Sequence, residues 1–262
     1  MSPADLTTVT ILAAVTFLLG MVIGFIGAGG AGLLVALLTS AFALPVHTAI
    51  GTALATMCLV TISGGASHLR EGNVAPKVGL VVGLAGAIGA IVGAQYSQLV
   101  PEAQLQIMAG LGLWVLAALM WIRTRFRVGA ANSWDDWVGE TPRPARDWAA
   151  SVGLGVSGGA AAAFLGVGMA PYLQLGYLAV LKLPLRQAVG TTMMTLIFIS
   201  ATGSLALWQA GDVSVPHFVG ATIGLASGAY LGARFTRRAP KQVLRFAVVL
   251  VPFIAGTILL IG

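Results

Sequence analysis

The chain has 262 residues, of which 58% are hydrophobic and 8% are charged. An average soluble domain has about 25% charged residues, so this composition excludes an ordinary soluble protein. The net charge of +6 does not indicate a nucleic-acid partner, because the basic residues stand at the ends of apolar segments, where they set membrane orientation. The single cysteine, Cys58, excludes an intrachain disulfide framework and a metal site of paired thiolates. The N-terminal sequence lacks a basic n-region, so we expect a mature start and no signal peptide.

Apolar segments follow one another along the whole chain, and several reach the roughly 20 residues that span a bilayer. We therefore predict an all-α polytopic membrane protein, with residues 1–262 forming one integral membrane domain. The predicted segments are 6–25, 31–43, 49–69, 78–99, 105–122, 148–165, 169–180, 188–208, 218–233 and 243–261.

The second segment, which follows a cluster of glycines between Gly24 and Gly32, is too short to span a bilayer upright. Glycine disfavours a helix interior by roughly 1 kcal/mol relative to alanine, so the cluster predicts a break between the first two segments. Broken backbone at membrane depth is tolerated where protein or a watery cavity covers it. Such breaks are typical of the central site of a transporter.

The two halves of the chain align without a gap at one constant offset, which we call the repeat offset. Leu44-Pro45 aligns with Leu183-Pro184, and Gly51-Thr52 aligns with Gly190-Thr191. We interpret the chain as two homologous repeats, 6–122 and 148–262, joined by a linker at 123–147. Each repeat is a Gly-broken pair of helices followed by three spanning helices.

Basic residues predict how the repeats are oriented, because positive charge favours cytoplasmic loops. Arg70 and Lys77 flank the loop after the third segment of repeat one, and the linker is rich in arginine. In repeat two, Lys182 and Arg186 instead precede the third segment. With five segments in each repeat, every basic loop falls on one side. We therefore predict inverted topology, with the linker cytoplasmic and both termini outside.

The Gly-rich breaks and the Gly-Thr pairs, near which the third helices are expected to start at Gly51 and Gly190, are the candidate binding site. We expect the helix N-termini there to approach one another near the membrane midplane. A helix N-terminus carries free N–H groups and partial positive charge, which suit a small anion such as a sulfonate or sulfite. Close packing of helices is the alternative role for the same residue types. The candidate substrate-binding residues are Gly27, Gly29, Gly30, Gly51, Thr52, Gly166, Gly168, Gln174, Gly190, Thr191 and Thr192.

His47 and Arg186 hold equivalent positions before the third helices and are candidates for gating or proton coupling. The apolar segments hold few ionisable residues, which disfavours a cation as the substrate. We predict no metal site and no cofactor. No catalytic motif and no nucleotide-binding motif occurs, so we do not expect an enzyme.

The motifs GAGGAG, LPVHTAIGT and GNV in the first half, and GVGMAPYLQL, LPLRQAVGTT and GDV in the second, resemble those of the sulfite exporter TauE/SafE family. The resemblance covers nearly the whole chain. It implies export of sulfur-containing anions across the bacterial inner membrane. Met169 and Ala170 stand where glycine is usual in the second cluster, which puts the common substrate in doubt.

We therefore expect a multi-pass secondary transporter for sulfite, sulfoacetate or other organosulfonates that works by alternating access. The alternatives are a passive small-anion channel and a non-transporting membrane accessory subunit. The expected partners are a small anion, the lipid bilayer and a coupled proton. The oligomeric state, monomer or homodimer, stays open.

Overall fold

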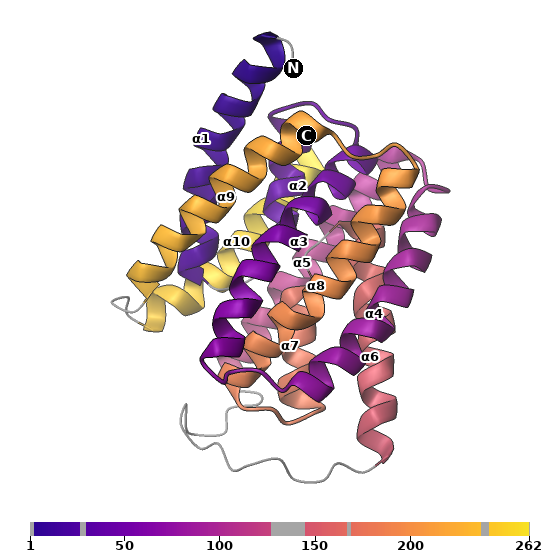
Figure 1. Ribbon diagram of the computed structural model, residues 1–262, viewed down its shortest axis with the longest axis vertical. Coiled ribbons are helices and arrows are strands. Elements are labelled where there is room, and N and C mark those ends of the chain that lie inside the picture. Colours follow the sequence, from indigo (N-terminus) through magenta and orange to yellow (C-terminus); the bar gives the residue numbers. More distant parts are fainter. Residues whose placement is uncertain (1–2, 27–29, 127–144, 167–168, 237–240, 262) are drawn as a thin grey trace.

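The computed structural model describes residues 3–26, 30–126, 145–166, 169–236 and 241–261, and every regular element in these ranges is an α-helix (Figure 1). Side chains are described there except at 3–5, 24–26, 67, 123–126, 145–147, 185–186, 232–236 and 241–248. The helices are α1 (Pro3–Ile26), α2 (Ala31–Ser40), α3 (Val46–Arg70), α4 (Pro76–Ser97), α5 (Glu102–Phe126), α6 (Ala145–Leu165), α7 (Ala170–Ala179), α8 (Leu185–Gln209), α9 (Val215–Thr236) and α10 (Lys241–Ile261).

Six of the helices in the described part of the chain are long and apolar enough to cross a membrane: α1, α3, α4, α5, α6 and α8. By contrast, α2 and α7 have 10 residues each, which at 1.5 Å per residue gives about 15 Å, half the thickness of a hydrocarbon core. The all-helical membrane fold predicted from the composition is thus confirmed.

The third helices begin earlier than the sequence predicted. We expected starts near Gly51 and Gly190, but α3 begins at Val46 and α8 at Leu185. In each case a proline directly precedes the helix, and the Pro45 carbonyl accepts the N–H of Ala49 at 2.9 Å. Proline is suited to a helix start because its φ is already near the helical value.

Helix boundaries in the two halves correspond at the repeat offset. Both ends of α2, α3 and α4 correspond to both ends of α7, α8 and α9. The start of α5 corresponds in the same way to the start of α10. The packing corresponds as well: α1 lies along α9, and α6 lies along α4.

Corresponding helices that touch run in opposite directions. In the α3–α8 pair, Gly64 faces Met193 whereas Gly203 faces Leu54, so α3 and α8 are antiparallel. In the α5–α10 pair, Gln106 bonds Leu259 and Trp114 bonds Thr257, which makes this pair antiparallel too. The α1–α9 and α4–α6 pairs are parallel, since contacts advance together along both helices.

The loops fall into two sets at opposite ends of the bundle (Figure 1). We call one end neutral because its loops, α2–α3, α4–α5 and α8–α9, contain no Lys or Arg. The start of α1 and the end of α10 lie at this end too. The amide of Gln98 donates to Asp212 at 2.7 Å, which joins two of these loops. The basic end holds the loops that contain Glu71 and Lys182.

Candidate functional site

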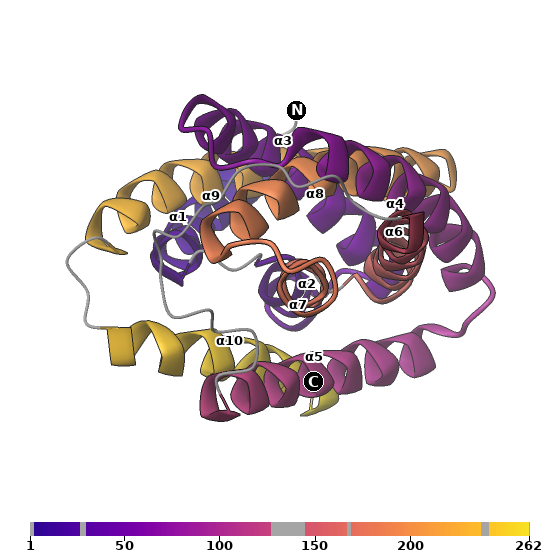
Figure 2. The ribbon, with the colours of Figure 1, turned by 90° about the horizontal axis from the view of Figure 1, so that it is seen from below.

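The two short helices lie in the middle of the bundle, one beyond the other along its long axis (Figures 1 and 2). The C-terminal end of α2 leads to the neutral end, and that of α7 leads to the basic end. Their N-terminal ends therefore face each other from opposite sides. We call the region between them the central junction.

Contacts with α5 place the central junction near the middle of the bundle. A Cβ on Gly32, the second residue of α2, would meet the Leu113 side chain. A Cβ on Gly112 would meet the side chain of Leu165, the last residue of α6, at 3.0 Å. Residues 112 and 113 are central in α5, so the end of α6 and the start of α2 come together at mid-height.

The N-terminal turns of α2 and α7 both direct positive partial charge at the central junction. The first N–H bonds back into each helix come from Leu34 to the Gly30 carbonyl at 3.0 Å and from Leu173 to the Met169 carbonyl at 2.9 Å. The N–H groups of residues 31–33 in α2, and those of Ala170 and Tyr172 in α7, have no partner within their own helix, whereas Pro171 has no N–H. The arrangement favours a small anion without requiring a charged side chain.

Gln174 is the distinctive polar side chain of this region. It lies in the second turn of α7 and is 7% exposed, and its Nε2 atom has no hydrogen-bond partner among the described residues. Side chains on a helix lean toward its N-terminus, so we expect this amide to lie toward the central junction. A buried amide without a partner costs about 1–3 kcal/mol. Gln174 therefore offers a donor that the protein itself leaves unused.

The corresponding position in α2 is Val35, which is 1% exposed. Tyr177, one turn beyond Gln174, is fully buried, and its hydroxyl bonds to that of Thr195. Its counterpart in α2 is Leu38. α7 thus carries two buried polar side chains at positions where α2 carries apolar ones. Tyr177 is not among the residues predicted from the sequence, where its only signal is a tyrosine in a short apolar helix.

The Gly-Thr pairs take part in reciprocal contacts between the halves. The Thr52 hydroxyl accepts the N–H of Ser214 at 3.0 Å, and the Thr191 hydroxyl accepts the N–H of Ala75 at 3.0 Å. Both threonines are fully buried. Each third helix is therefore held to the start of the other half's fourth helix.

The glycines beside these threonines permit the crossing. A Cβ on Gly51 would overlap the carbonyl oxygen of Asp212, and one on Gly190 would overlap that of Asn73. These contacts correct the expectation that helix starts at Gly51 and Gly190 meet at mid-height. Both glycines lie inside their helices and, because α3 and α8 are antiparallel, near opposite ends of the bundle.

The remaining candidates divide by position. Gly30 is the residue preceding α2, and Gly166 follows α6 with a φ of 64°. The fully buried Thr192 hydroxyl donates to the Ala188 carbonyl at 2.7 Å. Gly27, Gly29, Gly168 and the Arg186 side chain lie outside the described residues. Substrate binding at any of these candidates stays a prediction.

His47 lies at the neutral end and not at the central junction. Its Nε2 atom is 2.9 Å from the Ser97 carbonyl oxygen, and its Nδ1 atom is 3.8 Å from a Glu102 carboxylate oxygen. A carbonyl oxygen can only accept, so Nε2 carries the proton in that bond. Its role in gating or proton coupling stays a prediction.

Among the described residues, no group of three His, Cys, Asp or Glu could hold a metal ion. The donors at the central junction are the backbone N–H groups of the two helix N-termini, and we expect the Gln174 amide to add another. Such a donor set binds and orients an anion.

Residues 12–259 match the family described as "Sulfite exporter TauE/SafE". The chain is 39% identical over 246 residues to "Probable membrane transporter protein YdhB" of Bacillus subtilis (strain 168), covering 94% of this chain and 98% of that protein. It is 23% identical over 217 residues to "Probable membrane transporter protein YunE" of the same organism, covering 78% of this chain and 79% of that protein. No solved structure matches the chain significantly.

Proposed function

The chain belongs to the sulfite exporter TauE/SafE family of multi-pass membrane transport proteins, and from this premise we propose its substrate, direction and mechanism. It is a secondary transporter that exports small sulfur-containing anions, such as sulfite, sulfoacetate or other organosulfonates, across the bacterial inner membrane by alternating access.

One observation supports this proposal above all: the N-terminal ends of α2 and α7 face each other at the central junction (Figures 1 and 2), and the second turn of α7 carries Gln174, whose buried amide has no partner among the described residues. Two helix N-termini and an amide donor complement an oxyanion. Neither α2 nor α7 contains a charged residue, which suits transport because a bound anion must also leave.

The antiparallel α3–α8 and α5–α10 pairs support inverted repeats. Two helices that correspond in sequence and run oppositely across a membrane are related by an axis in the membrane plane. The segregation of Lys77 and Lys182 at the basic end supports the orientation. By the positive-inside rule the basic end and the 123–147 linker are cytoplasmic, and the termini are outside.

Alternating access requires contacts that break at one end of the bundle while the contacts at the other end stay formed. Thr52–Ser214 near the neutral end and Thr191–Ala75 near the basic end are matched contacts of this kind. The first breaks when the site opens outward, and the second breaks when it opens inward. A potential negative inside expels an anion with about 2.3 kcal/mol per charge per 100 mV.

Ligand-dependent thermal stability tests the substrate class. Purified protein is heated with sulfite, thiosulfate, sulfoacetate, taurine, sulfate, lactate or chloride. A ligand that binds only the folded state adds about 2.7 kcal/mol at a hundredfold excess over Kd. We expect a sulfur anion to raise Tm.

Gln174→Met keeps the length of the side chain and removes its amide, so it should abolish that Tm shift. Gln209→Met, at the exposed end of α8, is the matched control and should keep it. A shift with lactate and none with any sulfur anion would require the substrate assignment to be withdrawn.

A further inference from the structure

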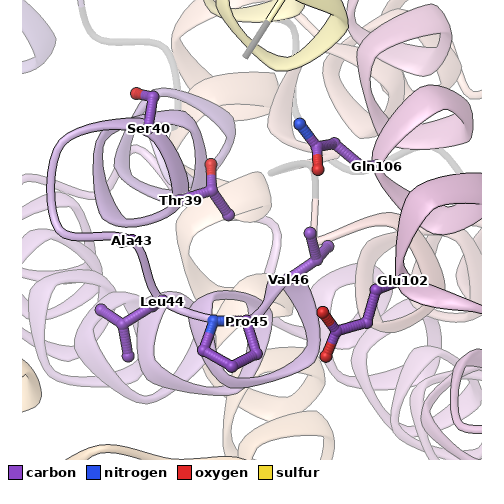
Figure 3. A pocket seen from close by; sticks show the side chains of 8 residues that line it. All are labelled: Thr39, Ser40, Ala43, Leu44, Pro45, Val46, Glu102 and Gln106. Atoms are coloured by element: carbon purple, nitrogen blue, oxygen red, sulfur yellow. The ribbon is translucent and has the colours of Figure 1, made fainter.

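A pocket of about 230 Å³ lies at the neutral end of the bundle, between the C-terminal end of α2, the loop after it and the start of α5 (Figure 3). Its polar lining consists of Thr39 and Ser40 from α2 and of Glu102 and Gln106 from α5. We call it the α2–α5 pocket. It lies at the far end of α2 from the central junction, so the proposed anion site does not account for it.

The hydroxyls of Thr39 and Ser40 both donate their hydrogen bonds to carbonyls within α2. Thr39 donates to the Val35 carbonyl at 2.9 Å, and Ser40 donates to the Ala36 carbonyl. A hydroxyl has one proton and two lone pairs, so each oxygen retains lone pairs for a ligand. Toward the pocket both residues act as acceptors.

The α5 side is also a source of acceptors. Gln106 donates its Nε2 to the Leu259 carbonyl at 3.0 Å, which orients the amide and leaves its Oε1 atom as an acceptor. The ionised carboxylate of Glu102 can only accept. Figure 3 shows both side chains reaching from α5 beside the loop at Pro45. The Glu102 side chain is 57% exposed, so the pocket communicates with solution.

The backbone adds negative potential. The C-terminal end of a helix carries partial negative charge, and α2 ends at Ser40 in the pocket wall. The last turn of α2 contains no basic residue. His47, which approaches Glu102 to 3.8 Å, is the nearby titratable group that could compete for the carboxylate when protonated.

This lining is not a general consequence of the duplicated fold. At the repeat offset, Thr39 and Ser40 correspond to Leu178 and Ala179. Glu102 and Gln106 correspond to Lys241 and Arg245. The second half thus has two basic residues and no hydroxyl at the equivalent positions. The four acceptor residues of the first half therefore have no acceptor counterparts at the corresponding positions of the second half.

We propose that the α2–α5 pocket binds a small monovalent cation from the solution at the neutral end. Hydroxyl, amide and carboxylate oxygens suit either an alkali metal ion or an ammonium group. A single carboxylate favours a monovalent ion over Ca²⁺, which generally draws on six to eight oxygen ligands. This cation site goes beyond the proposed anion transport and does not depend on the central junction.

Thermal stability of the purified full chain tests the proposal. Tm is measured against increasing NaCl, KCl, LiCl, NH4Cl or methylammonium chloride. Tetramethylammonium chloride, whose cation has no N–H donor, is added so that ionic strength and chloride concentration stay constant. A saturable rise in Tm with the alkali ions identifies a metal site. A rise with ammonium and methylammonium alone identifies an ammonium site.

Variants assign the shift to the pocket. Glu102→Gln should weaken the apparent cation affinity at least tenfold. Glu102→Asp keeps a carboxylate and should retain most of the affinity of the unmodified protein. Glu71→Gln, which removes an exposed carboxylate at the basic end, is the matched control and should leave affinity unchanged. A cooperative melting transition without added cation shows that each variant folds.

The proposal would be overturned if none of these cations gave a saturable shift in Tm. It would also be overturned if Glu102→Gln bound the cation with the same apparent affinity as the unmodified protein. The anion site is scored separately, since a sulfur anion should still raise Tm in Glu102→Gln. Loss of cation binding with anion binding intact, or the reverse, distinguishes the two proposals.

Discussion

The hydroxyl of Thr52 accepts the backbone N–H of Ser214 at 3.0 Å, across 162 residues of chain. Thr191 and Ala75 repeat this bond at the same distance in the other half. The two bonds join the third helix of each half to the start of the other half's fourth helix. A Gly-Thr pair that resembles a binding motif can therefore hold the two halves of the chain together.

Removing the Thr52 acceptor should destabilise the fold. Thr52→Val has nearly the same shape but leaves the Ser214 N–H without its partner, which costs about 1–3 kcal/mol. We expect this loss in the free energy of unfolding, measured by denaturant titration in mixed micelles. Thr52→Ser keeps the hydroxyl and should lose much less. Equal losses in both variants would indicate that packing, and not the hydrogen bond, determines the effect.

Gly51→Ala and Gly190→Ala should be far more damaging than an alanine elsewhere. The new Cβ would overlap the carbonyl oxygen of Asp212 or Asn73, and backbone cannot move aside as a flexible side chain does. We expect little folded protein in detergent, measured as the monodisperse fraction by size-exclusion chromatography. At Gly153 a Cβ meets nothing within 4 Å, so Gly153→Ala should fold normally. Normal folding of Gly51→Ala would contradict the close crossing.

The helices were predictable from local signals. Apolar length, glycine clusters and prolines are read within one segment, and the repeat offset extends them to the other half. The two short helices, α2 and α7, followed from these signals.

Contacts between the halves were not predictable in the same way. Gly51 and Thr52 suggested a helix start, but Pro45 starts α3 earlier, and the partner loop at Asp212 lies far along the chain. The α2–α5 pocket was missed for a similar reason, since its polar residues come from two separate helices. Gln174 was among the candidate binding residues, but only the structure reveals that its amide has no partner among the described residues.

Gln174→Met should stabilise the protein while impairing transport. The amide is buried without a partner, so its removal relieves a penalty of about 1–3 kcal/mol. We expect a higher free energy of unfolding together with a lower rate of substrate flux into proteoliposomes. Gln209→Met should change neither. A destabilised Gln174→Met protein would indicate that the amide has a partner that stabilises the fold.

Labelling from outside the cell should reveal which end of the bundle faces the medium. Single cysteines at Leu99 and Ala210, both exposed in loops of the neutral end, are introduced into a Cys58→Ala background. We expect both to react with an impermeant maleimide on intact cells. A cysteine at Glu71, at the basic end, should react only after permeabilisation. Labelling at Leu99 without labelling at Ala210 would contradict the inverted arrangement.

The central claim is that a small sulfur anion binds at the central junction and crosses by alternating access. Counterflow in proteoliposomes tests it most directly: vesicles loaded with unlabelled sulfite or sulfoacetate are diluted into a trace of the labelled anion. The account predicts transient, saturable accumulation of label that Gln174→Met abolishes and Gln209→Met preserves. Flux that equilibrates without accumulation, or accumulation unchanged in Gln174→Met, would contradict it.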